Sequence, residues 1–222
     1  MASQKKSSRP KHADPKPAPR LYLVTPRVAA VAEFVPQLIA ALEAGDVAAV
    51  LLRLAEADER TLINIAKDVA RTVQDKDVAL LLDGHSDLVA RAAADGAHLA
   101  DFAEFSAALP QLKPDRIAGC GGLDTRHDAM AAAEANADYV MFGEPDVHGE
   151  RPSFEAIEER VAWWAEVFEA PCVAYAANAE EVAALVKAGA DFVALGDWVW
   201  TQDAAAVIAA AASHMKLPET AA

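Results

Sequence analysis

The sequence has few cysteines and a shortage of basic residues, and both facts exclude classes of protein. Its two cysteines, Cys120 and Cys172, lie far apart and lack the spacing of a disulfide framework or a metal site. Lysine and arginine number 20 against 34 acidic residues, and the formal charge of −14 disfavours nucleic acid and anionic membranes as partners. No apolar run reaches the roughly 18 residues of a membrane span, and no secretory signal opens the chain. We therefore expect a cytoplasmic protein.

The basic residues are concentrated at the start of the chain. Residues 1–20 carry six lysines and arginines against a single acid, Asp14, together with four prolines and no apolar periodicity. This composition predicts a disordered basic tail, which serves either as a solubilising leader or as an interaction arm. Residues 21–216 are expected to form one domain, followed by a short C-terminal tail over 217–222.

An internal repeat organises the predicted domain. Residues 94–99, 136–140 and 188–193 each end an Ala-rich helix at small residues and enter a short apolar strand, and 44–50 is a looser copy. The copies are about 40 to 50 residues apart, which is room for two strand–helix units. The small residues allow the end of the helix and the start of the strand to lie close together.

Strands and helices alternate strictly along the predicted domain. Short Leu-rich or β-branched runs predict strands at 21–25, 48–53, 78–82, 97–99, 116–119, 139–143, 172–176 and 192–195. Helices are predicted at 29–44, 59–75, 87–94, 102–109, 126–136, 154–168, 179–188 and 204–214. Ser86, Thr125 and Ser153 are candidate N-caps.

Eight such units predict a single-domain TIM (β/α)8 barrel. The strands are apolar throughout, as expected of strands that are covered on both faces. A doubly wound open sheet is the alternative, but it usually has a glycine fingerprint after the first strand. The sequence there is Thr25-Pro26-Arg27-Val28.

Ionisable residues follow the second, third and fourth strands, where a barrel of this type carries its chemistry. Arg53 binds a phosphate or pairs with a neighbouring acid (Glu56, Asp58 or Glu59). Asp83 ends the third strand and is a candidate ligand for Mg²⁺ and a catalytic residue. His85 and Asp87 beside it belong to the same site, or else face solvent and cap the next helix. Asp101 is either a second metal carboxylate or a helix cap.

The loops after the fifth and sixth strands offer groups for an anion and for proton transfer. Gly121 and Gly122 form either an anion-binding nest of backbone N–H groups or a tight turn. The loop over 143–152 brings His148 as a candidate general acid or base and Arg151 as a candidate anion ligand. Ordinary surface-loop chemistry explains this loop equally well.

The last two loops are where many barrels bind phosphate. Asn178 is the polar residue after the seventh strand, and Gly196 opens the turn after the eighth. Asp197 follows directly, and a fixed carboxylate there competes with a bound phosphate. Trp198 walls a ligand pocket or packs in the core.

Four segments resemble the thiamine phosphate synthases and the related thiazole tautomerases. Residues 21–25 (LYLVT) look like the family's first strand, and 94–99 (ADGAHL) are similar to its "GADGVHLG". Residues 138–143 (DYVMFG) resemble "ADYIGVG", and 188–194 (AGADFVA) resemble "AGADGVAV". The resemblance covers nearly the whole predicted barrel in order.

The resemblance implies Mg²⁺-assisted joining of hydroxymethylpyrimidine pyrophosphate to thiazole phosphate. Arg53 persists from the family's "QLR", and Asp83 stands one place before the acid of its "ND" pair. The acid of "HLGQED" falls on an alanine, with Asp101 and Glu104 nearby as substitutes, and Thr125 is kept from "GVSVHT".

Several phosphate-binding residues of the family are missing. The lysine of its "TPTK" loop has no counterpart, "GGI" reads Ala176-Ala177-Asn178, and the serine after the eighth strand falls near Asp197. Losing one charge-assisted hydrogen bond typically costs about 1.5 to 3 kcal/mol. Losing several should weaken the binding of a doubly anionic substrate.

Three functions follow. The first is a divergent synthase with Asp83 on Mg²⁺, Arg53 on pyrophosphate and Asn178 near the thiazole phosphate. The second is a catalytically degenerate barrel that binds another small ligand or acts as a regulator, with Trp198 at its pocket. The third is a tautomerase with His148 as base. The ligand is expected to be phosphorylated or heteroaromatic, and the family suggests a homodimer.

Overall fold

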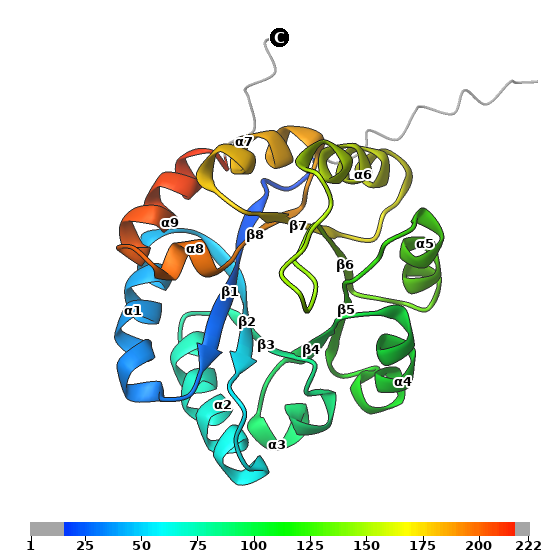
Figure 1. The fold of residues 1–222 in the computed structure, drawn as a ribbon. Coiled ribbons are helices and arrows are strands. Elements are labelled where there is room, and N and C mark those ends of the chain that lie inside the picture. Colours follow the sequence, from blue (N-terminus) through cyan, green and yellow to red (C-terminus); the bar gives the residue numbers. More distant parts are fainter. Residues whose placement is uncertain (1–15, 216–222) are drawn as a thin grey trace, which may run out of the picture.

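The computed structural model describes residues 16–215, in which eight parallel strands close into a barrel (Figure 1). Each strand pairs with the next in the sequence, and β8 pairs with β1 to complete the ring. The strands are β1 (Arg20–Val28), β2 (Val47–Leu54), β3 (Ala79–Asp83), β4 (Gly96–Leu99), β5 (Ile117–Cys120), β6 (Tyr139–Phe142), β7 (Cys172–Ala176) and β8 (Phe192–Leu195). The TIM barrel is confirmed, and the open sheet is excluded.

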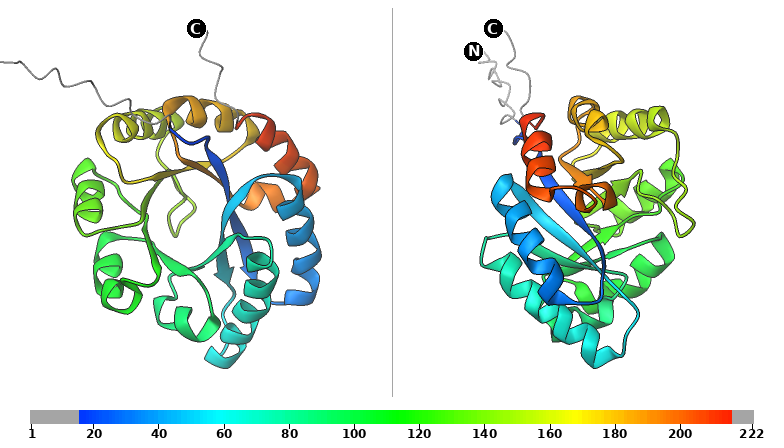
Figure 2. Two further views of the ribbon diagram at one scale, coloured as in Figure 1. Left: turned by 180° about the vertical axis from the view of Figure 1, so that it is seen from behind. Right: turned by 60° about the vertical axis from the view of Figure 1, so that its left-hand side comes forward.

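Helices surround the strands, as all the views in Figures 1 and 2 show. They are α1 (Val31–Ala44), α2 (Glu59–Gln74), α3 (Val89–Ala92), α4 (Phe102–Leu112), α5 (Arg126–Glu134), α6 (Phe154–Val167), α7 (Ala179–Ala188), α8 (Asp197–Trp200) and α9 (Ala204–Ser213). Within the described residues, no helix is both long and apolar enough to cross a membrane.

One helix prediction was wrong. The helix expected at 87–94 is a 3₁₀ turn, η1 (Ser86–Leu88), followed by the four-residue α3, which ends where Ala93 turns left-handed. Ser86 is therefore not an N-cap, whereas Thr125 and Ser153 are. The helix predicted at 204–214 is α9, which begins where the Asp203 side chain accepts the N–H of Ala206, and the short α8 that starts at Asp197 was not predicted.

The core has two apolar layers. Alternate strand residues point into the barrel, where Tyr22, Leu51, Leu81, Met141 and Val173 belong to one buried cluster. The residues between them point outward and pack under the helices in a larger cluster. Both cysteines are buried and unbridged, as expected from their spacing.

Aspartates of the sequence repeat tie neighbouring strands together where the strands begin. Each accepts the N–H of the first or second residue of the preceding strand and donates its own N–H to the same residue's carbonyl. The pairs, with side-chain distances, are Asp95 to Leu80 at 2.7 Å, Asp138 to Ala118 at 2.7 Å and Asp191 to Cys172 at 2.9 Å. The repeat therefore carries paired hydrogen bonds as well as close packing.

The last residues of the predicted tail are described by the structure, and two of them contact the barrel. Lys16 Nζ bonds the Gly189 carbonyl at 2.7 Å and pairs with Asp191 at 2.8 Å, and Arg20 already belongs to β1 and pairs with Asp46. Lys16 and Arg20 thus contact the amino end of the barrel. The rest of the predicted tail and the C-terminal tail over 217–222 lie outside the described residues.

The aspartate of the repeat should be worth a measurable part of the stability. Asp95→Ala leaves the N–H of buried Leu80 without its side-chain partner, so the free energy of unfolding should fall by about 1 to 3 kcal/mol. Urea denaturation measures this change. Asp115→Ala removes the same charge at an exposed position and should stay within about 0.5 kcal/mol of the parent protein. If both variants lost the same free energy of unfolding, the hydrogen bond from Leu80 to Asp95 would not be the source of the stabilisation.

Candidate active site at the mouth of the barrel

Along β2 and β3, the side chains that point into the barrel are apolar in the interior and polar at the carboxyl end of the strand. Arg53 lies two residues beyond Leu51, and Asp83 lies two residues beyond Leu81. Because strand side chains alternate between two faces, both polar side chains reach the mouth of the barrel at its carboxyl end. The structure therefore brings together the two residues on which the sequence prediction most depended.

Arg53 is held by two neighbouring elements. Its Nε donates to the Thr25 carbonyl at 2.5 Å, and its backbone N–H donates to the Thr25 hydroxyl at 3.0 Å. The guanidinium also forms an ion pair with Asp197 on α8. The alternative pairing with Glu56, Asp58 or Glu59 is not found: Arg53 pairs with Asp197, Asp58 caps α2, and Glu59 pairs with Arg91.

Asp83 ends β3 in a partly buried position. Burial raises the pKa of its carboxyl group, and the nearby guanidinium groups of Arg53 and Arg27 oppose that rise. His85 lies near enough for its charge to lower the pKa of Asp83, and with Glu104 it lines a surface depression of about 400 Å³, whereas Asp87 is exposed. Of the three ionisable residues expected here, Asp83 and His85 are therefore neighbours, and Asp87 faces solvent.

Three predicted ligand residues act as helix N-caps. Asp101 accepts the N–H of Glu104 at 2.7 Å, and Thr125 accepts that of Asp128 at 3.1 Å in a reciprocal capping box. Asn178 accepts the N–H of Glu181 at 3.0 Å. Capping explains these residues without a ligand. Metal binding by Asp101 and substrate binding by Thr125 and Asn178 stay predictions.

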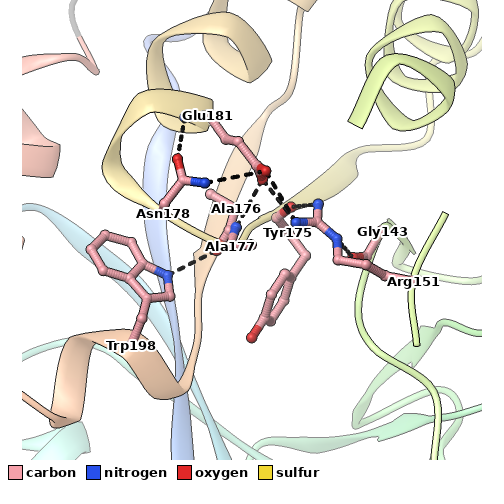
Figure 3. A network of polar contacts seen from close by, with 8 residues as sticks. All are labelled: Gly143, Arg151, Tyr175, Ala176, Ala177, Asn178, Glu181 and Trp198. Atoms are coloured by element: carbon pink, nitrogen blue, oxygen red, sulfur yellow. Dashed lines mark hydrogen bonds and ion pairs between the residues drawn. The ribbon is translucent and has the colours of Figure 1, made fainter. Parts of the chain in front are cut away.

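Loop 6, residues 143–153 between β6 and α6, lies across the centre of the ring in Figure 1. Arg151 anchors it: the guanidinium bonds the carbonyls of Gly143 and Tyr175 at 3.1 Å each and pairs with both oxygens of Glu181 (Figure 3). Both partners of the pair are largely buried, with 18% and 12% of their side chains exposed. Arg151 thus has a structural role: its guanidinium pairs with the carboxylate of Glu181 rather than with the ligand anion that was predicted.

His148 lies in the exposed part of loop 6. Its backbone N–H donates to Asp146 at 2.8 Å, and its side chain has none of the site residues above as a hydrogen-bond partner. Trp198 is partly buried against the core and donates its indole N–H to the Ala176 carbonyl at 2.9 Å (Figure 3). Packing therefore accounts for Trp198.

The predicted glycine positions make room for side chains of the mouth. A Cβ at Gly121 would overlap both Glu144 Oε1 and His98 Nε2, and a Cβ at Gly196 would overlap the Tyr175 hydroxyl. Gly122 adopts a φ of +59°, and its N–H donates to Glu144 Oε1 at 2.6 Å. The expected anion nest is thus already in contact with a carboxylate of the chain itself.

A buried polar chain runs below this point and was missed in the sequence. The Tyr22 and Tyr139 hydroxyls are 2.9 Å apart, and His98 Nδ1 lies 3.0 Å from the Tyr139 hydroxyl. Burial lowers the pKa of His98 to about 4, so its ring is neutral at pH 7. The inward-facing position of His98, two residues after Gly96 in a short strand, was the signal available.

Glu144 was the second residue missed. Its Oε2 atom is buried and has no hydrogen-bond partner among the described residues. Burial raises the pKa of Glu144 to about 7, although the Gly122 N–H and the charge of Arg160 favour the ionised form. A buried carboxyl oxygen without a hydrogen bond lowers the stability of the fold unless a ligand supplies the missing hydrogen bond.

The chain matches known sequences over most of its length. A family model described as thiamine monophosphate synthase matches residues 21–198. A thiamine-phosphate synthase of Rhodospirillum centenum is 40% identical over 195 residues, covering 86% of this chain and 94% of the relative. One from Hyphomonas neptunium is 36% identical over 200 residues, covering 86% and 90%.

Solved structures share the fold. A thiamine phosphate pyrophosphorylase from Pyrococcus furiosus superposes with a TM-score of 0.74 at 22% identity, covering 88% of this chain and 95% of that one. A geranylgeranylglyceryl phosphate synthase from Thermoplasma acidophilum gives 0.66 at 14% identity, covering 89% and 94%. The second match shows that the barrel alone does not fix the substrate. The sequence matches do fix the family: the chain belongs to the thiamine monophosphate synthase family.

Proposed function

We propose that the chain joins hydroxymethylpyrimidine pyrophosphate to thiazole phosphate, forming thiamine phosphate and pyrophosphate. The bond between the methylene carbon and the pyrophosphate oxygen breaks, and its electron pair leaves with pyrophosphate. The thiazole nitrogen supplies the pair for the new carbon–nitrogen bond. The observation that carries this proposal, beside family membership, is the meeting of Arg53 and Asp83 at one barrel mouth.

Arg53 is the proposed ligand of the pyrophosphate group. Its partner Asp197 has 64% of its side chain exposed, so water screens the ion pair and it contributes little. A pyrophosphate carries more charge than one carboxylate and accepts two parallel N–H bonds from a guanidinium. Exchange of Asp197 for the substrate is therefore favourable, while the Thr25 carbonyl keeps Arg53 Nε in place.

Asp83 is the proposed ligand of Mg²⁺. Among residues 16–215 no group of three or more His, Cys, Asp or Glu side chains forms a metal cluster. Mg²⁺ commonly uses one or two carboxylates together with substrate phosphates and waters. The donor set therefore fits an ion that arrives with pyrophosphate, whose negative charge the bound ion would neutralise as the group leaves.

Cytoplasmic location and a homodimer stay predictions.

A second candidate function is a barrel of the same family that no longer catalyses this reaction. It is favoured because the chain's own carboxylates already occupy three anion-binding groups. Asp197 holds Arg53, Glu181 holds Arg151, and Glu144 holds the Gly122 N–H. Purified protein with both substrates and Mg²⁺ decides between the candidates: failure to form thiamine phosphate, together with no binding of inorganic pyrophosphate, would leave the second.

Asp83→Asn should reduce the rate of thiamine phosphate formation by about 10²-fold or more, because it removes the charge that holds the metal. The dependence of the rate on Mg²⁺ concentration should shift upward. Asp101→Asn is the matched control, since asparagine also caps helices and should retain both stability and activity. A comparable loss in Asp101→Asn would show that Asp101 binds the metal too.

Asp197→Asn should tighten the binding of inorganic pyrophosphate by about two- to fivefold, because it removes the carboxylate that competes for Arg53. Isothermal titration calorimetry at low ionic strength measures the change. Glu56→Gln removes one negative charge at an exposed position and controls for net charge. Weaker binding in Asp197→Asn than in this control would mean that Asp197 orients Arg53 rather than competing with the ligand.

A further inference from the structure

Glu144 stands at the mouth but has no part in the reaction proposed above. It is the second residue after β6, and its Oε1 atom lies beside His98 Nε2 in the space that a side chain at Gly121 would fill. One oxygen accepts the Gly122 N–H at 2.6 Å. The other, Oε2, is buried and has no hydrogen-bond partner in the part of the chain that the structure describes.

The charges around Glu144 do not explain this arrangement. His98 is neutral and brings no cation from β4. Arg160 on α6 is the favourable charge, but its guanidinium donates to the carbonyls of Leu123 and Asp124, and the Asp124 carboxylate opposes ionisation of Glu144. From inside the barrel, Tyr22 and Tyr139 use their hydroxyls on each other and on His98. Among residues 16–215, Glu144 Oε2 thus has no hydrogen-bond donor.

The missing partner must be a hydrogen-bond donor, because an ionised carboxylate only accepts. A partner that enters at the mouth meets the carboxyl group and the imidazole together, because Glu144 Oε1 and His98 Nε2 both lie against the same side of Gly121. A flat ring with an exocyclic amino group and a ring nitrogen meets both conditions: the amino N–H reaches the carboxylate, and the edge of the ring faces the imidazole. An anionic phosphate meets neither, since it offers no donor and would be repelled.

We propose that Glu144 recognises the aminopyrimidine ring of the substrate, with Oε2 accepting a hydrogen bond from the exocyclic amino group and His98 facing the same edge of the ring. This inference rests on the proposed function and deepens it. Arg53 and Asp83 then bind the pyrophosphate end of that substrate, while Glu144 fixes its ring.

Recognition of this kind also helps the chemical step. As the carbon–oxygen bond breaks, positive charge spreads from the methylene carbon into the aminopyrimidine ring. The amino N–H becomes a stronger donor, so a carboxylate that accepts it binds the developing cation better than the ground state. The negative charge of Glu144 is thereby matched to the reacting ring rather than to the leaving group.

The first test uses the pyrimidine alcohol without pyrophosphate, titrated calorimetrically into the full-length protein. Glu144→Gln keeps an acceptor for Gly122 but presents an N–H where Oε2 stood, so binding should weaken by about 10- to 100-fold. Glu150→Gln, an exposed change in the same loop, should bind like the parent. An analogue with an oxo group in place of the amino group should bind the parent poorly and lose that disadvantage in Glu144→Gln.

The second test follows pH. The proposed acceptor is the ionised carboxylate, and burial places the pKa of Glu144 near 7, so affinity for the alcohol should fall about tenfold between pH 8 and pH 6. Glu144→Gln should lack this component of the pH dependence, while Glu150→Gln should retain it. Equal affinities in the parent and Glu144→Gln, or identical pH profiles, would overturn the proposal.

A stability measurement shows that the variant folds and that the carboxyl group is buried. Because its pKa is raised in the folded state, ionisation of Glu144 destabilises the protein progressively as pH rises from about 4.5 to 7. Glu144→Gln should therefore melt at a higher temperature than the parent at pH 8 and at a similar temperature at pH 4. If the difference in melting temperature between Glu144→Gln and the parent were the same at pH 4 and pH 8, Glu144 would not be a buried ionisable group.

The proposed synthase activity and the proposed role of Glu144 can be disproved independently of each other. If the parent forms thiamine phosphate and Glu144→Gln keeps the parent's KM for the pyrimidine substrate and its pH profile, recognition by Glu144 is wrong and the synthase activity stands. If the parent forms no product but binds the alcohol through Glu144, the synthase activity is wrong and the recognition site remains.

Discussion

The paired hydrogen bonds of the repeat aspartates are the constraint on which the rest of the barrel depends. Asp95, Asp138 and Asp191 each bind both backbone groups of one residue near the start of the preceding strand. A slip of one residue would break both bonds and would turn every inward side chain outward. With the strand starts fixed in this way, the register at the opposite end follows, and Asp83 stands beside His98, which stands beside Gly119.

The same carboxylate chemistry has different consequences at the mouth. Arg151 and Glu181 form a largely buried pair with several further hydrogen bonds, and breaking it would leave a buried charge. Arg53 and Asp197 form a pair whose acid is mostly exposed, and water can replace either partner at small cost. The first pair therefore fixes loop 6 across the barrel, and the second is the one that a ligand can open.

The fold could be predicted from the sequence because its signals are local and repeated. Eight apolar runs alternating with Ala-rich helices leave few topologies, and the repeat around Asp95, Asp138 and Asp191 marks where strands begin. The short α3 and the separate α8 could not be predicted, because they depend on single backbone features such as the left-handed Ala93 and the cap at Asp203. Both lie in connections, where few residues decide the outcome.

The site could be predicted only in part. Arg53 and Asp83 follow from strand ends, because the carboxyl ends of barrel strands meet in space whatever the loops do. Residues in loops were harder to assign: Asp101, Thr125 and Asn178 carry side chains suited equally to ligands and to helix caps, and in the structure they cap. His98 and Glu144 were missed because their significance comes from three-dimensional burial, which residue type alone does not reveal.

The two ends of the barrel differ in how completely their polar groups are paired, and this difference locates function. At the amino end, aspartate side chains and backbone groups satisfy one another, so nothing there calls for a ligand. At the carboxyl end, Glu144 keeps one buried oxygen without a donor in the described chain, and Arg53 is held by an exposed acid. A protein retains such incomplete pairing where binding completes it, because elsewhere the same burial would only lower stability.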